Sequence, residues 1–167
     1  MKNVKGSVRR GIGFATASHC SGASPFMLEH SGAIVTFNED GSINLTVSPA
    51  SFGQHIWGAL SQIAAEVLGI GVEDVHIITG ETEKCLWDIG SHASRSTYVI
   101  GNAVLAAAND ARSQLLECGS RLLGVRAAEL DIKDRQVYVK ACPERAVFVS
   151  EVAQSAIWDM KNGAKDI

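Results

Sequence analysis

The chain has 167 residues, enough for one domain with its own hydrophobic core. Its net charge of −3 and isoelectric point near 5.9 leave no basic surface of the kind that binds nucleic acid. No stretch approaches the roughly twenty apolar residues that span a bilayer, so we expect a cytoplasmic protein that has neither a nucleic acid nor a membrane as its partner.

The first half of the chain predicts β-structure followed by a helix. Residues 11–19 are short and apolar with glycine punctuation, which suits a strand or a strand-like lead-in. Residues 33–37 and 42–47 alternate in polarity, and the turn between them ends in a glycine, so we expect a hairpin. Apolar residues then recur at helical spacing over 55–68, and Gly69 ends that helix.

The second half predicts a short strand over 75–79 and one long helix from near Ser94 to Gly124. A C-terminal helix is expected from Ser150, with Glu151 in its first turn. Three candidate strands lie between the two helices, at residues 129–132, 136–139 and 146–149. This order predicts a two-layer α+β fold, in which two long helices plus a C-terminal helix cover a mixed β-sheet. One domain over residues 1–167 is the economical interpretation.

The four cysteines, Cys20, Cys85, Cys118 and Cys142, are widely separated and contain no C-x-x-C pair. Local spacing therefore supplies neither a zinc site nor an iron–sulfur cluster. We interpret them as reduced, mostly buried thiols.

Two segments far apart in the sequence place small or polar residues where a helix begins. One is the Gly53–Gln54 step, and the other runs from Asp88 to Thr97. The first turn of a helix has free backbone N–H groups, which attract anionic ligands. Two such helix starts in one small domain indicate a site for a bulky, charged cofactor.

Gln54 is a candidate catalytic residue. Its neutral amide donates and accepts hydrogen bonds without titrating, which suits a neighbour of a high-valent metal. Gly53 has no Cβ, so the backbone there can approach a ligand closely. The alternative is that these two residues are only a loop before a helix.

The second segment offers Ser91, Ala93, Ser94 and Arg95 as candidate cofactor-binding residues. Serine hydroxyls and backbone N–H groups hold phosphate groups, and arginine forms paired hydrogen bonds with anions. The alternative is a helix cap at Ser94, with Arg95 on the solvent face or paired with Asp88.

Several motifs in a fixed order carry a resemblance to a known family. They are Arg10-Gly-Ile-Gly13, Gly53-Gln54, Gln62-Ile-Ala-Ala-Glu66-Val-Leu-Gly69, Asp88-x-Gly-Ser91-x-Ala-Ser94-Arg95-x-Thr97 and Gly101-Asn-Ala-Val104. From about Val8 to Val104 the chain resembles the molybdenum-cofactor-binding large subunit of the xanthine dehydrogenase and aldehyde oxidase family. Within that family it looks most similar to the 4-hydroxybenzoyl-CoA reductase and CO dehydrogenase type.

The resemblance implies that Gln54 lies beside an oxo ligand of molybdenum, which makes it the strongest single candidate for a catalytic residue. The family usually has a Gly-Gln-Gly sequence here, followed three residues later by a Thr. This chain has His55 in place of the second glycine and Gly58 in place of the Thr. A histidine ring at this position would either face the substrate channel or pack as a helix-start side chain.

The resemblance further implies part of a molybdenum hydroxylase that acts on a small-molecule substrate. The chain would be the first half of the molybdopterin-binding region, forming one wall of the cofactor cleft and inactive alone, because the glutamate base of such enzymes lies in a motif without a counterpart here. Expected partners are the C-terminal half of the molybdenum subunit, an iron–sulfur subunit and a flavin (FAD) subunit, in an oligomer. A non-catalytic assembly module and a domain for a small phosphate-bearing ligand are the alternatives.

Overall fold

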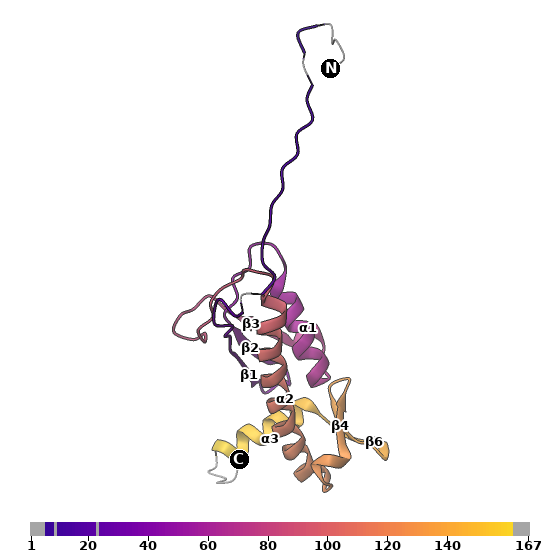
Figure 1. Ribbon diagram of the computed structural model, residues 1–167. Coiled ribbons are helices and arrows are strands. Elements are labelled where there is room, and N and C mark those ends of the chain that lie inside the picture. Colours follow the sequence, from indigo (N-terminus) through magenta and orange to yellow (C-terminus); the bar gives the residue numbers. More distant parts are fainter. Residues whose placement is uncertain (1–5, 9, 23, 162–167) are drawn as a thin grey trace.

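The computed structural model describes residues 6–8, 10–22 and 24–161. Within them the chain forms six strands, three α-helices and two short 3₁₀ turns. The elements are β1 (Ala33–Phe37), β2 (Ile43–Val47), α1 (Ile56–Leu68), β3 (Val75–Ile78), α2 (Ser96–Leu123), β4 (Leu130–Lys133), β5 (Gln136–Val139), β6 (Cys142–Phe148) and α3 (Val149–Lys161), as Figure 1 shows.

The N-terminal lobe consists of β1, β2 and β3 with α1 and the first half of α2. Its sheet has the order β1-β2-β3 and is mixed, because β2 is antiparallel to β1 and parallel to β3. The two helices pack against each other, and α2 lies against β1. The inward residues of β2, namely Ile43, Leu45 and Val47, are completely buried between the sheet and the helices.

The C-terminal lobe consists of β4, β5, β6 and α3, packed against the second half of α2. Its three strands form an antiparallel sheet in chain order, with an irregularity near Val139. Val137 in the central strand and Val152 in α3 are fully buried in a second hydrophobic core, which includes Leu115 and Leu123 of α2. This lobe thus has a core of its own.

Helix α2 joins the two lobes. At about 1.5 Å per residue its 28 residues extend about 42 Å, and the helix contributes Ile100 and Val104 to the first core and Leu115 to the second. Phe37 at the end of β1 contacts both cores. Gly124 ends α2 in a left-handed conformation, which allows the chain to turn back into the C-terminal lobe.

Polar contacts fix how the lobes meet. The Arg135 guanidinium, in the turn between β4 and β5, donates to Asp74 Oδ1 at 2.6 Å and to the Asp40 carbonyl at 2.9 Å. Its backbone N–H donates to the Gly69 carbonyl just after α1, at 2.8 Å. One residue of the C-terminal lobe therefore holds three separate segments of the N-terminal lobe.

The β1–β2 turn is stabilised from within. Asp40 Oδ1 accepts hydrogen bonds from the Ser42 hydroxyl at 2.6 Å and from its backbone N–H at 2.9 Å. These bonds lower the pKa of Asp40. Because the charged carboxylate is the form that accepts them, their contribution to stability is present above the ordinary pKa of aspartate and is lost as the pH falls through the lowered value.

The structure confirms the α+β class and the hairpin, and it corrects three details. The strands form two small sheets rather than one, because α2 is long enough to carry a separate sheet at its second half. Residues 11–19, expected as a strand or a strand-like lead-in, are not part of a sheet and form an extended, exposed segment that runs away from the body (Figure 1). The cysteines are unpaired, as expected, yet Cys118 alone of them is buried. Within the described residues, no helix is both long and apolar enough to cross a membrane.

The turn between β1 and β2 generates a stability prediction. Gly41 has φ +82, and a Cβ there would lie 2.9 Å from the Ser150 backbone nitrogen. We expect Gly41→Ala to lower the free energy of unfolding by about 2–4 kcal/mol, from left-handed strain and a backbone clash together. Urea denaturation measures this difference.

Gly80 provides the matched control, because its φ of +80 is nearly the same and no described atom lies within 4 Å of a Cβ there. Gly80→Ala should therefore lose only the strain, about 1–2 kcal/mol. Equal losses in the two variants would mean that the contact with Ser150 contributes nothing.

Candidate functional site

Two loops of the N-terminal lobe come together beside the starts of α1 and α2. The first loop is residues 48–55 and the second is residues 79–95, following β2 and β3. The Ala50 carbonyl accepts two hydrogen bonds, one from Ser91 Oγ at 2.8 Å and one from Gln54 Nε2 at 3.0 Å. The two segments predicted to share a cofactor thus share a hydrogen-bond acceptor.

A cavity of about 450 Å³ lies between these loops. Four of the six residues expected at the site line it, namely Gln54, Ser91, Ala93 and Ser94. Gly53 is not a lining residue, although its neighbours Phe52 and Gln54 are. The first turn of α2 completes the wall with Ser96 and Thr97. The structure therefore brings the two predicted segments to one cavity, hereafter the helix-start pocket.

Gln54 is exposed, and its amide is hydrogen-bonded to its own loop. Besides donating to the Ala50 carbonyl, it accepts from the Phe52 backbone N–H at 2.7 Å. Gly53 has φ +106, and no described atom lies within 4 Å of a Cβ built there. The backbone at position 53 therefore faces open space, which leaves room for a group to approach it closely.

Three non-glycine residues with strained backbone conformations lie at or next to this pocket. Ala93 and Ser94 are consecutive left-handed residues, with φ 46 and φ 54, and His55 before α1 has φ 58. Each such non-glycine residue costs about 1–3 kcal/mol, and such residues concentrate at ligand sites. Asp134 and Arg135 are the other two non-glycine residues with positive φ in the described chain, and they form the β4–β5 turn.

His55 and Gly58 depart from the family pattern together, and they touch. A Cβ at position 58 would lie 2.3 Å from His55 Nε2. The ring therefore occupies the space beside α1 that a threonine at position 58 would need. Of the two expectations for this ring, the structure supports packing at the helix start, since His55 does not line the helix-start pocket.

Arg95 holds the second loop from inside. Only 1% of the residue is exposed. Its guanidinium pairs with Glu29 at 2.5 Å and with Asp88 at 3.1 Å. It also donates to two carbonyls, those of Gly90 and His30, both at 2.8 Å.

The burial of Arg95 argues against its expected role as an anion-binding residue. Its Nε and both terminal nitrogens donate to protein acceptors, and the side chain does not line the helix-start pocket. The alternative that paired Arg95 with Asp88 describes its surroundings better. Asp88 also accepts from the Gly90 backbone N–H at 2.7 Å, so the pair shapes the loop that leads to Ser91.

His92 is a pocket residue that the sequence did not single out. Its Nε2 atom is buried and has no hydrogen-bond partner in the described part of the chain. Leaving a polar atom unsatisfied costs about 1–3 kcal/mol, so such an atom indicates a partner that arrives with a ligand or another chain. An isolated histidine in a loop carries no spacing signal, which is why sequence reasoning passed over it.

The lining of the helix-start pocket has the chemistry of an anion site. Its polar groups are an amide, hydroxyls, an imidazole and the helix-start N–H groups, and none of its described lining residues is Asp or Glu. The N-terminus of a long helix adds a partial positive charge. A ligand carrying negative charge is therefore favoured over a cation.

The buried ion pairs generate a second stability prediction. Arg95→Met leaves the carboxylates of Asp88 and Glu29 without their cation, and we expect a loss of about 3–5 kcal/mol in the free energy of unfolding. Arg126→Met is the matched control, because Arg126 pairs with Glu129 on the surface and its side chain is 83% exposed. That pair should contribute at most about 1 kcal/mol. Urea denaturation of both variants separates the two cases, and similar losses would contradict the role given to Arg95.

Several known proteins are similar to the chain, and a molybdenum-binding subunit is among them. The chain is 31% identical over 166 residues to the xanthine dehydrogenase molybdenum-binding subunit of Escherichia coli O157:H7, which covers 98% of the chain and 22% of that protein. It is 28% identical over 157 residues to the nicotine 6-hydroxylase large subunit of Paenarthrobacter nicotinovorans, covering 89% and 19% respectively. The chain thus spans about a fifth of the length of these relatives.

Solved structures show the same relationship. Quinoline 2-oxidoreductase from Pseudomonas putida 86 superposes with a TM-score of 0.73 at 30% identity, covering 79% of this chain and 17% of the other. CO dehydrogenase from Oligotropha carboxidovorans gives a TM-score of 0.70 at 27% identity, covering 75% and 16%. The profile of the family described as "Molybdopterin cofactor-binding domain" matches residues 1–166. The chain therefore belongs to the molybdopterin cofactor-binding domain family.

Proposed function

We propose that this chain forms one wall of the molybdenum-cofactor cleft of a xanthine dehydrogenase-like oxidoreductase. The observation that carries the proposal is the helix-start pocket, where Gln54 and the Ser91–Ser94 segment meet. Family membership and the similarity to molybdenum-binding subunits support it. When bound, the cofactor supplies the oxygen-transfer and electron-transfer chemistry.

The pocket fits a molybdopterin on three counts. No described lining residue is acidic, so the negative charge of a pterin phosphate meets no repulsion there. The buried His92 Nε2 lacks a partner, and position 53 faces open space. These features are typical of a binding site for a large polar ligand.

The residues of the two loops would have different roles, according to their chemistry. Gly53, Ser91, Ala93 and Ser94 would hold the cofactor through backbone N–H groups and hydroxyls. The Gln54 amide would donate to an oxygen on the metal, after leaving the loop contacts that it now makes with Ala50 and Phe52. We assign Arg95 a positioning role, because it holds the loop rather than lining the pocket.

The proposed molybdenum subunit is longer than this chain. The chain spans about a fifth of its relatives, and the pocket residues Phe52, Gln54, Ser94 and Thr97 are exposed. We propose that the rest of the molybdenum subunit supplies the opposite wall and the glutamate base, and that iron–sulfur and FAD-binding subunits carry electrons onward. The substrate would be a small molecule that enters between the walls.

The role of Gln54 can be tested in the holo complex. Gln54→Ala should leave bound molybdenum unchanged and lower turnover per molybdenum about 10- to 100-fold, the cost of one hydrogen bond to a charged group. Gln62→Ala, at an exposed position of α1 outside the helix-start pocket, should change neither quantity. Metal analysis and steady-state kinetics measure both. Undiminished turnover in Gln54→Ala would instead favour a non-catalytic assembly module.

Cofactor retention tests the shared cleft. The chain purified by itself should contain little molybdenum, because several residues that line its pocket are exposed to solvent. Co-expression with the rest of the molybdenum subunit should restore about one metal per complex. Stoichiometric, tightly bound molybdenum in the isolated chain would refute the idea that the cleft needs a second wall.

A further inference from the structure

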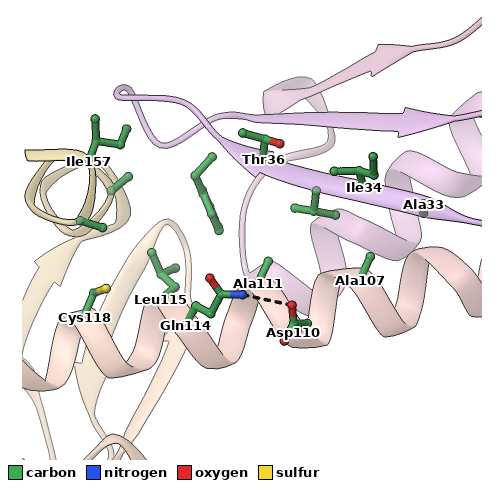
Figure 2. Close-up of a pocket in the computed structure, with 14 residues that line it drawn as sticks. Ala33, Ile34, Thr36, Ala107, Asp110, Ala111, Gln114, Leu115, Cys118 and Ile157 are labelled. Carbon is green, nitrogen blue, oxygen red and sulfur yellow. Dashed lines mark hydrogen bonds between the residues drawn. The ribbon is translucent and has the colours of Figure 1, made fainter. Parts of the chain in front are cut away.

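An apolar groove of about 780 Å³ lies between β1, α2 and α3, away from the helix-start pocket. Figure 2 shows β1 on one side with Ile34 and Thr36, and α2 on the other with Ala107 and Leu115. Ile157 of α3 closes one end of the groove. All five residues of β1 line it, so the groove follows the strand along its whole length.

β1 is the edge of its sheet, and the described chain offers no strand to pair with its outer side. Its sequence, AIVTF, contains no charge and no proline, the devices that normally protect an edge from pairing. The N–H and C=O groups on that side need partners. Ile34 in this strand is 42% exposed, so a large apolar side chain of the edge strand is left open to solvent.

The width of the layers indicates how large the missing element is. Two packed helices, each about 10 Å across, form a layer about 20 Å wide. Three strands about 4.8 Å apart cover only about 14 Å of it. α2 lies on the β1 side of this layer, and its Ala107 and Ala111 are the floor that stays uncovered. The uncovered width is that of one strand, and it is too narrow for a helix.

We propose that a fourth β-strand, supplied by the rest of the molybdenum subunit, pairs with the free edge of β1 and fills this groove. The identity of the donor rests on the proposed function. More than three quarters of each similar molybdenum subunit lies outside the matched span, so such a strand has a source. Main-chain hydrogen bonds give this kind of pairing its affinity, and side chains on alternate residues give it specificity.

Charge decides between this donor and a second copy of the chain. Asp110 lines the groove, and it accepts a hydrogen bond from Gln114 Nε2 at 3.0 Å. In a pairing of two copies through β1, the incoming strand would be a second AIVTF segment, which carries no cation to pair with Asp110. The incoming strand should therefore alternate apolar residues and carry a lysine or arginine facing Asp110.

The test uses the chain alone and the complex that it forms with the rest of the molybdenum subunit from the same organism, identified by mass spectrometry. Hydrogen–deuterium exchange should show residues 33–37 exchanging at least tenfold more slowly in the complex. Exchange at these residues that does not change between the two samples overturns the proposal. Protection confined to α2 would mean that something other than a strand fills the groove, and would overturn it equally.

Substitutions on the groove floor add a second measurement. Ala107→Arg places a bulky charge on the floor and should weaken the complex at least tenfold. Ala106→Arg makes the same change at the adjacent, exposed position outside the groove and should leave the affinity unchanged. Equal effects of the two variants would count against the proposal.

Two further results separate the possible failures. A chain that dimerises by itself, with β1 protected in the dimer, identifies a second copy as the occupant and overturns the proposal. A complex that protects β1 but holds no molybdenum leaves the strand in place, and it refutes the proposed function alone.

Discussion

The buried Arg95 guanidinium is the interaction on which the candidate site depends. It joins Glu29, the His30 carbonyl, Asp88 and the Gly90 carbonyl, so segments from before β1 and after β3 meet at the start of α2. Without that cation two carboxylates would lie together in a nearly dry environment, Asp88 being almost completely buried. The left-handed residues Ala93 and Ser94 follow the loop that this cluster fixes, and the stability of the cluster offsets their strain.

Much of the fold could be predicted from local patterns. The hairpin, α1 and α2 follow from alternation, from helical spacing and from the glycines that end them, and their observed bounds differ from the expected ones by one or two residues. The division into two sheets could not be predicted, because sheet order depends on contacts between distant residues. Residues 11–19 share the apolar composition of a strand, yet no described strand pairs with them.

Part of the candidate site could likewise be predicted from the sequence, and part could not. Gln54 and Ser91 were singled out through ordered motifs, and both line one cavity. Their roles toward a cofactor stay a prediction. The burial of Arg95 was not predictable, because its partner Glu29 lies in a loop without any periodic signal. His92 was missed for a related reason: an unsatisfied atom can be recognised only when all its neighbours are in place.

The contact between His55 and Gly58 couples two positions at the start of α1. The family that the sequence resembles usually has glycine at the first position and threonine at the second, whereas here His55 Nε2 lies 2.3 Å from where a Cβ of residue 58 would be. Any side chain at position 58 therefore requires the imidazole to move. The effect of a substitution at one of the two positions depends on the residue that occupies the other.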